Sequence, residues 1–360
     1  MPKVISGYAA PQFDAVRTAF AQGFAAGDEL GASLCVYLDG LKRVDLCGGT
    51  ADEAISRPWE RDTTAIVYSA TKGALAIVLA GTRAAEILQN QAPTWTPGSA
   101  HGYHAVTVGW LVSTLLSKAR GRPADDVFRE MIAEPLALDF TIGQPAAGSA
   151  PVAMLRDDDR QRRPTTHPPA DRDTTVIAAA IRAAAQDPGS MLAHTMTTTG
   201  ALPIPDAATW NQPRVYGASA PAVSGITNAR SLATPYAATI GEVAGVRLFS
   251  QRTLEAATRE QVSGADRVLF ISTRFATGFQ LPSQMVTMLS DSSFGHCGGR
   301  RRTRLRRPRI SDRIRLRAES IAVEPRWRPP YRGDSQRPAI CGELRAGTGP
   351  TGPEAKGQAT

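Results

Sequence analysis

The sequence lacks the features that place a chain in a membrane or a secretory route. No apolar run reaches the ~18–20 residues of a membrane-spanning helix, and the first 13 residues, MPKVISGYAAPQF, contain no apolar signal core. Cysteine is scarce: Cys35, Cys47, Cys297 and Cys341 are the four, and they do not have the spacing of metal ligands. We therefore expect a reduced cytoplasmic protein without a membrane span or a metal site.

The net positive charge does not indicate a nucleic-acid-binding protein. The 360 residues carry a formal charge of +8. Residues 299–360 contain 15 Arg and 1 Lys against 6 Asp or Glu, a net charge of +10, which leaves −2 for the other 298 residues. The basic character therefore belongs to the C-terminal segment alone, and the rest has the 42% hydrophobic content typical of globular proteins.

The pattern of apolar residues indicates strands near both ends of the chain and helices between them. Helices are predicted over residues 10–26, 70–88, 104–119, 124–137, 176–186 and 228–241, and strands over 32–40, 42–50, 268–281 and 283–290. Asp39-Gly40 separates the first two strands and favours a tight hairpin. Residues 144–173 are rich in Pro, Asp and Arg and are expected to form loops. This order predicts an α/β (α+β) sandwich of an antiparallel sheet and helices, with a helical subdomain.

The stretch YSATKGALA at residues 68–76 contains a serine and a lysine three residues apart. On a helix this spacing puts both side chains on one face. A desolvated lysine can take the proton of a serine hydroxyl and so activate it as a nucleophile. By itself the pattern is weak, because a serine at a helix start followed by an exposed lysine gives the same letters.

Two further blocks follow in the chain, and they change the interpretation. Residues 95–105 read WTPGSAHGYHA, and residues 294–299 read FGHCGG. Together with Ser69-x-x-Lys72, these blocks resemble the class C β-lactamase-like serine hydrolases, and most closely their family VIII carboxylesterase branch. The resemblance extends through most of residues 5–299 and implies a β-lactamase/transpeptidase-like fold.

The resemblance implies a role for each matching residue. Ser69 would be the acylated nucleophile, Lys72 its base, and Tyr103 the group that relays the proton or protonates the leaving alcohol. His296-Cys297-Gly298 would replace the Lys-Thr-Gly of β-lactamases, which favours esters over β-lactams. The backbone N–H groups of Ser69 and Gly299 would form the oxyanion hole. No metal or cofactor is implied, and the substrate would be a small ester or related acyl compound.

Each of these residues also has an ordinary structural interpretation. Tyr103 could be a surface tyrosine, and His296 could be a loop histidine. His101 and His104 resemble metal ligands, but no third ligand is evident, so we interpret them as structural. Nothing beside Cys47 or Cys297 indicates a lowered thiol pKa.

The sequence departs from the family pattern between the first two blocks. Lys72 and Tyr103 are only 31 residues apart, where the family has a much longer helical segment. We infer an internal deletion near Gly81–Arg83. Part of the helical subdomain that walls the cleft would then be missing, and Tyr103 would be less firmly positioned.

A second departure follows the third block. Codons can be chosen for Thr303–Leu316 (TRLRRPRISDRIRL) such that reading one base later gives LAFADPESAIGFGY, which resembles the strand pair found there in the family. We infer a frameshifted C-terminus and expect residues 300–360 to be disordered and both layers of the fold to be incomplete. The sheet would have an uncovered edge, and the oxyanion strand would lack a neighbour.

The sequence thus predicts a serine carboxylesterase acting on short-chain esters, with three alternatives left open. One is β-lactamase or D-Ala peptidase activity. Another is a truncated relative that no longer catalyses any reaction. The third is a nucleic-acid binder that uses the basic tail, although this tail has no aromatic interleaving and no recognisable binding fold. Oligomeric state stays open.

Overall fold

The computed structural model describes most of the chain before residue 297. The described residues are 5–27, 29–80, 95–96, 98–145, 151–156, 183–184, 187, 189–197, 207–283, 286, 288 and 290–296, with two short backbone segments at 320–323 and 344–345.

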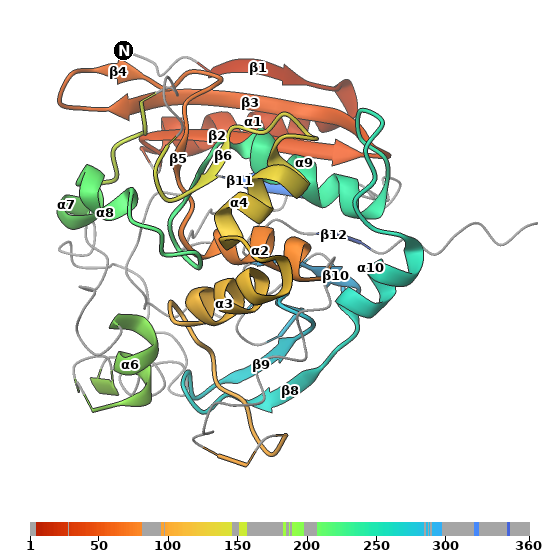
Figure 1. Ribbon diagram of the computed structural model, residues 1–360. Coiled ribbons are helices and arrows are strands. Elements are labelled where there is room, and N and C mark those ends of the chain that lie inside the picture. Colours follow the sequence, from red (N-terminus) through yellow and green to blue (C-terminus); the bar gives the residue numbers. More distant parts are fainter. Residues whose placement is uncertain are drawn as a thin grey trace, which may run out of the picture.

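An antiparallel sheet forms one layer of the molecule (Figure 1). Its strands are β1 (Ile5–Ala9), β2 (Gly31–Leu38), β3 (Leu41–Asp52) and β4 (Arg57–Pro58), with β3 between β1 and β2 and with β4 paired to the far end of β3. The predicted hairpin between β2 and β3 is confirmed. Asp39 and Gly40 have φ of 54° and 68°, the left-handed conformation that a type I′ turn requires.

Helices cover both faces of this sheet, and the alternation of β2 explains why. Leu34 and Val36 pack with Phe20 and Phe24 on the side of α1 (Asp14–Ala25). Cys35 and Tyr37 belong to the main core on the other side, against α9 (Ala229–Ile240). Because both faces of β2 are apolar, the strand is buried almost throughout.

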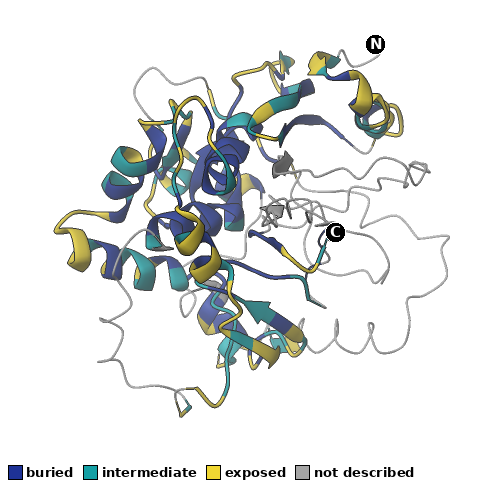
Figure 2. Cartoon of the chain, turned by 90° about the vertical axis from the view of Figure 1, so that its right-hand side faces the viewer, coloured by how far each residue is buried: buried dark blue, intermediate teal, exposed yellow. Residues whose placement is uncertain are grey.

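The central helix α2 (Thr71–Ala80) is mostly apolar and is buried from Thr71 to Val78. It contacts α9, α3 (Val108–Arg120) and α4 (Ala124–Phe128), which continues into a π-helical turn at Arg129–Ala133. The helix α10 (Gln251–Thr258) packs against α9. Figure 2 shows the buried residues gathered in the middle of the molecule, with exposed residues on the outer helices.

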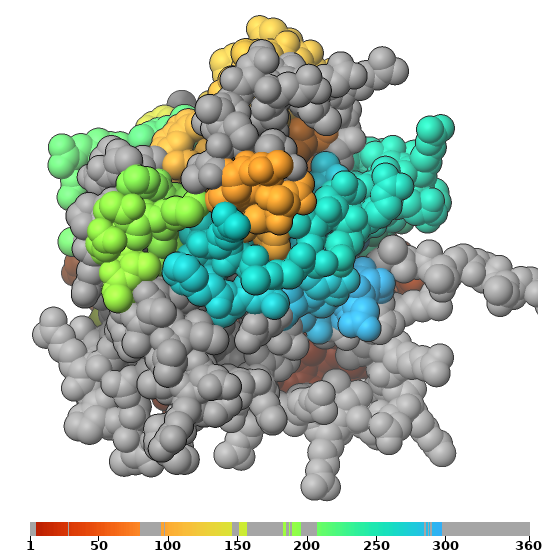
Figure 3. Space-filling view, turned by 90° about the horizontal axis from the view of Figure 1, so that it is seen from below, coloured from red at the N-terminus to blue at the C-terminus, as the bar shows by residue number. Residues whose placement is uncertain are grey.

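Two smaller β structures complete the fold, one beside the large sheet and one at the opposite end of the molecule (Figure 1). The first is a three-stranded sheet in which β7 (Gly225–Thr227) lies between β5 (Ala65–Ile66) and β6 (Phe140–Ile142). The second is a hairpin of β8 (Val262–Ala265) and β9 (Ser272–Phe275). Seen from below, this hairpin lies against the residues near 100 and against α6 (Met191–Thr197) (Figure 3).

Two short helices, α7 (Ala207–Trp210) and α8 (Pro213–Tyr216), lead into β7. Among the described residues, no helix has both the length and the apolar character needed to cross a membrane.

Two strands from the C-terminal segment correct the expectation about the sheet edge. β11 (Ser320–Val323) pairs antiparallel with β2, from Ser320 opposite Tyr37 to Val323 opposite Leu34. β12 (Leu344–Arg345) pairs with β10 (Ser293–Phe294). The outer edge of β2 and the strand before His296 therefore both have neighbours, so the expectation of an uncovered edge and an unpaired oxyanion strand is wrong at these positions.

Other predicted elements differ in extent. Of the strand predicted over 268–281, only Ser272–Phe275 (β9) is a strand. The helix predicted over 104–119 begins at Val108, because residues 101–107 form a loop held by the β8–β9 hairpin. The strand predicted over 283–290 is wrong at its described residues, which lie outside helices and strands. A strand prediction there rested on apolar letters alone, which a buried loop also supplies. The predicted deletion near Gly81–Arg83, most of the helix over 176–186 and most of residues 300–360 lie outside the described residues.

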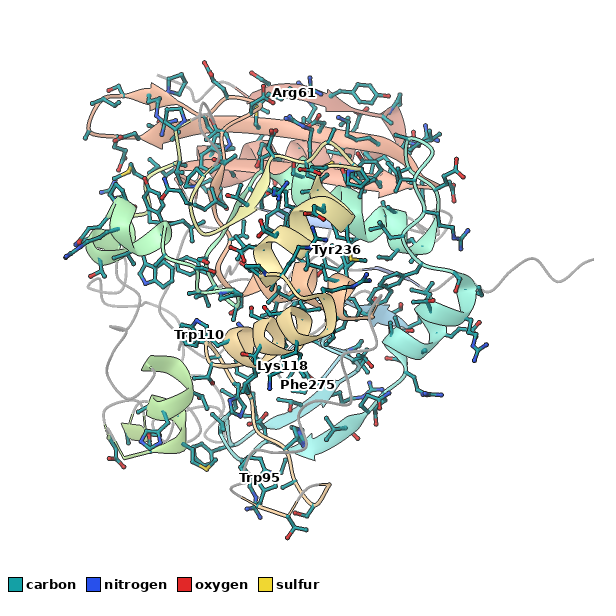
Figure 4. The ribbon with its side chains drawn as sticks, viewed as in Figure 1. Arg61, Trp95, Trp110, Lys118, Tyr236 and Phe275 are labelled. Atoms are coloured by element: carbon teal, nitrogen blue, oxygen red, sulfur yellow. The ribbon has the colours of Figure 1, made fainter. Side chains whose placement is uncertain are left out.

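Gly73 shows how tightly α2 is packed. A Cβ atom at this position would lie 1.7 Å from the hydroxyl oxygen of Tyr236, which α9 directs toward α2 at the centre of the molecule (Figure 4). Tyr236 is itself almost fully buried, so neither side has room to move.

We predict that Gly73→Ala destabilises the fold by about 1–3 kcal/mol, the usual range for overpacking a core. Chemical denaturation of the purified variant measures this change. Gly241→Ala is the matched control, because its added Cβ would have no atom closer than 3.8 Å. Equal stability of the two variants would contradict the packing argument.

Candidate active site

Ser69 lies on a tight turn between β5 and α2. The turn, Tyr68–Ala70, begins at a residue with φ of 46°, an uncommon conformation for a side chain of this size. The buried Thr71 hydroxyl donates to the carbonyl of Tyr68 and accepts from the N–H of Gly225, at 2.9 Å. The N–H of Val67 donates to the carbonyl of Gly225 at 2.9 Å. These hydrogen bonds to Gly225 on β7 therefore fix the backbone turn that carries Ser69.

Lys72 is buried next to this serine, with 6% of its surface exposed. Its Nζ lies 2.8 Å from Oγ of Ser69 and donates to the carbonyl oxygen of Ala222 at 3.0 Å. Burial lowers the pKa of the amine to about 7, because a charged ammonium is poorly solvated there. The interpretation of Lys72 as an exposed helical lysine is therefore wrong.

Tyr103 reaches the same point from the loop before α3. Its ring stacks against the rings of Phe275 and His296, with centroids 6.1 Å apart in each case, and Figure 4 labels Phe275 on β9 below α3. The centroid of the ring is 5.7 Å from Nζ of Lys72, and its hydroxyl is close enough to the side chain of Ser69 for this contact to lower the pKa of the phenol. The interpretation of Tyr103 as a surface tyrosine is therefore wrong.

The hydroxyl of Tyr103 holds its proton firmly. Burial raises its pKa to about 12, with a further contribution from the charge of Asp266, and the contact with Ser69 opposes these only in part. A neutral phenol and an amine that titrates near neutral pH thus face one serine hydroxyl. The amine can accept a proton from the serine hydroxyl, and the phenol can donate one to a neighbouring oxygen.

His296 comes from the third block and lies at the same site. It is 3% exposed and stacks on Tyr103, as described above. The strand before it is held by Gly295, which exchanges both backbone hydrogen bonds with Gln280, at 2.7 and 3.1 Å. Gly298 and Gly299 lie outside the described residues, so the oxyanion pair of Ser69 and Gly299 stays a prediction.

The two other histidines of the second block have side-chain partners instead of a metal-like arrangement. Nε2 of His101 lies 2.8 Å from the hydroxyl of Thr273, and Nδ1 of His104 lies 2.8 Å from that of Thr107. Within the described part of the chain, no group of three His, Cys, Asp or Glu side chains is placed to hold a metal ion. Burial raises the pKa of the Cys47 thiol, which makes it less reactive.

Three parts of the site were not identified from the sequence. The carbonyl of Ala222 orients the lysine, and Asp266 and Thr273 on the β8–β9 hairpin contact the loop that carries Tyr103. A backbone carbonyl leaves no trace in a sequence. Asp266 belongs to no recognised motif, so only its isolated position in the apolar run ADRVLFIST could have indicated a buried carboxylate.

Most of the chain is similar to known proteins. Residues 79–311 match the protein-family model described as beta-lactamase. The match includes Tyr103 and His296, and it begins after Ser69 and Lys72 in the chain.

Individual relatives cover a larger part of the chain. The esterase/beta-lactamase LipL of Mycobacterium tuberculosis is 29% identical over 82% of this chain and 78% of its own length. A crystal structure of a family VIII carboxylesterase is 26% identical with a TM-score of 0.66, covering 82% of this chain and 88% of the other. A penicillin-binding protein homologue from Caulobacter crescentus is 28% identical with a TM-score of 0.62, covering 82% and 88%.

The family model matches well over half of the chain, and the solved structures share its arrangement of an antiparallel sheet and helices. The predicted family and fold class are confirmed. The chain belongs to the beta-lactamase family and is a hydrolase with the fold of that family.

Proposed function

We propose that the protein is a serine carboxylesterase that cleaves short-chain esters through an acyl-enzyme on Ser69. The observation that carries this proposal is the buried Nζ of Lys72, 2.8 Å from Oγ of Ser69. A lysine with a pKa near 7 is available as the neutral amine at neutral pH, which is what a general base for serine requires.

In the proposed reaction, the neutral amine of Lys72 takes the proton of Ser69 as Oγ attacks the ester carbonyl. The backbone N–H groups of Ser69 and Gly299 would hold the oxyanion, together with the segment that contains His296 and Gly298. The bond to the alcohol then breaks as Tyr103 donates its proton to the leaving oxygen, and Lys72 returns a proton to Tyr103. Water, activated by the same groups, releases the acid and restores Ser69.

The third block supports an ester in preference to a β-lactam. His296-Cys297-Gly298 stands where β-lactamases have Lys-Thr-Gly, so the lysine that would pair with a β-lactam carboxylate is absent from that motif. The second candidate, β-lactamase or D-Ala peptidase-like activity, is supported by the likeness to a penicillin-binding protein homologue and by the name esterase/beta-lactamase given to the relative LipL. Turnover of a chromogenic cephalosporin at the rate of ester turnover would favour it.

A member of this family can also be a catalytically disabled relative, which is the next alternative for this protein. The arrangement of Ser69, Lys72 and Tyr103 argues against that alternative, because Nζ of Lys72 lies within hydrogen-bonding distance of Oγ of Ser69 and the phenol of Tyr103 interacts with the same serine. The predicted disorder of residues 300–360 is wrong for Ser320–Val323 and Leu344–Arg345, which form strands, and the other residues of this segment lie outside the described part of the chain. The reduced cytoplasmic location stays a proposal. Two free cysteines, Cys35 and Cys47, are buried, which fits a reducing compartment.

A fluorophosphonate probe followed by peptide mapping tests the nucleophile. We expect labelling at Ser69 in the wild type and its loss in Ser69→Ala, while Ser117→Ala on α3 keeps it. A folded wild-type protein that takes up no label would be a disabled hydrolase. Full ester turnover by Ser69→Ala would exclude Ser69 as the nucleophile.

The pH dependence of kcat/KM tests the base. Because the neutral form of Lys72 is the active one, kcat/KM for a p-nitrophenyl ester should rise with pH with a midpoint near 7. Lys72→Arg should lower it by about 1,000-fold or more, since a guanidinium stays charged at every accessible pH. A rate independent of pH between 6 and 8.5 would contradict this assignment.

Stability provides an independent test that needs no substrate. Between the lowered pKa of about 7 and the ordinary value of 10.5, the unfolded chain binds more protons than the folded one. Stability therefore rises with pH through this window. Lys72→Met removes the cost of burying a charged ammonium group. Its free energy of unfolding should therefore exceed that of wild type by roughly 2 kcal/mol more at pH 6 than at pH 9.

Denaturant titration at the two pH values measures the difference. Lys118→Met, at an exposed position of α3 (Figure 4), is the control and should show no pH-dependent gain. An equal gain for Lys72→Met at both pH values would mean that the lysine keeps its ordinary pKa in the folded protein.

A further inference from the structure

Asp266 is a fully buried carboxylate at the start of the turn between β8 and β9. Its side chain has 0% exposure. One oxygen, Oδ1, accepts from the N–H groups of Val268 and Leu269, both at 2.9 Å. These two bonds are those of an ordinary Asx turn and would shape the hairpin by themselves.

The same carboxylate makes contacts beyond its own turn. Oδ1 also accepts from the backbone N–H of Tyr103 at 3.1 Å, across 163 positions of sequence. Oδ2 accepts from the hydroxyl of Thr273 at 3.1 Å, and this hydroxyl lies 2.8 Å from Nε2 of His101. The N–H of Arg267 donates to the carbonyl of His101 at 2.9 Å. The hairpin therefore holds the loop at His101 and at the backbone of Tyr103.

These bonds act at the start of the loop, whereas its later part is held elsewhere: the N–H of Val106 donates to the carbonyl of Thr195 at 2.9 Å, and Ala105 and Val106 pack in a buried cluster. The helix that follows begins only at Val108, and the ring of Tyr103 rests on Phe275 and His296 without a hydrogen bond between them. A charged acceptor makes a stronger hydrogen bond than a neutral one, and more so where water is excluded. The carboxylate thus fixes the main chain from which the phenol of Tyr103 extends.

We propose that Asp266 is a positioning residue for catalysis, which fixes the backbone of Tyr103 so that its hydroxyl meets Ser69. Thr273 and His101 complete the arrangement by holding the second carboxylate oxygen. Asp266 acts through Tyr103 and does not touch the reacting atoms. This inference rests on the proposed function, in which Tyr103 donates the proton to the leaving alcohol.

Kinetics of three variants test the catalytic part. Asp266→Ala removes every acceptor and should lower kcat by about 100-fold, because a small displacement of a catalytic group has an effect of this size. Asp266→Asn keeps Oδ1, so its decrease in kcat should be at least tenfold smaller than that of the alanine variant. Thr273→Val should lower kcat by about threefold to tenfold, with rescue by Thr273→Ser. In all of them KM should stay within about twofold, since the loss concerns the transition state.

Asp45→Asn is the matched control. Asp45 is another carboxylate of low exposure, and it binds Lys42 and Arg61 on the sheet. It should change stability without changing kcat. A general effect of losing a carboxylate with side-chain partners would appear equally in this variant.

NMR spectra of protein labelled with ¹⁵N-tyrosine report on the backbone amide of Tyr103 directly. This test needs neither enzymatic activity nor the alanine variant. The chain has seven tyrosines, and Tyr103→Phe identifies the Tyr103 amide by removing its signal. In Thr273→Val and Asp266→Asn this amide should shift, while the other tyrosine amides stay within their wild-type positions. An unmoved Tyr103 signal in Asp266→Asn would show that the carboxylate does not bind this amide, and would overturn the proposal.

The outcomes separate this inference from the proposed function. If wild-type Ser69 takes no fluorophosphonate label, the proposed function fails, and the amide shift still decides whether Asp266 holds Tyr103. If wild type is labelled and Asp266→Ala, folded by its spectrum, keeps the wild-type kcat, the positioning role of Asp266 is wrong and the proposed function stands.

Discussion

The site depends on keeping an amine out of water. Lys72 lies inside a layer of apolar helices, and its Nζ has a serine hydroxyl and a backbone carbonyl as partners. Burial alone lowers its pKa, so the packing around α2 also sets the basicity of the Lys72 amine. Burial of α2 stabilises the fold because it removes apolar side chains from water. It also destabilises the fold, because the ammonium group of Lys72 loses its hydration. Such a conflict between stability and chemistry is typical of sites that need a shifted pKa.

Segments from distant parts of the chain supply the rest of the site. The turn at Ser69 is fastened to β7 through Thr71 and Gly225. Tyr103 is held from the β8–β9 hairpin by Asp266, and His296 arrives on a strand that pairs with Gln280. None of these contacts is local in sequence. The geometry of the proton-transfer groups is therefore a property of the packed domain and not of any single motif.

The sequence predicted the parts that depend on local pattern. The apolar runs of β2 and β3, the Asp39-Gly40 turn and the helical spacing of apolar residues in α1 are all short-range signals, and the structure contains each of these elements. The convergence of Ser69, Lys72, Tyr103 and His296 followed from ordered motifs of a known family. Asp266 and the carbonyl of Ala222 were missed because their roles arise from long-range contacts. The strand predicted over 283–290 failed because burial, and not strand pairing, explains its apolar residues.

The pairing of β11 with β2 has a consequence for how this sheet selects its neighbours. Ser320–Val323 comes from an Arg-rich region unlike the rest of the chain, yet it adds to the sheet in regular antiparallel register. A strand edge offers only N–H and C=O groups, which every residue except proline can satisfy. The paired residues themselves read SIAV, so the segment that adds to this edge is mostly apolar although its surroundings are rich in arginine. An edge of this kind lets a domain take up a short, mostly apolar stretch from a region of very different composition as a structural part.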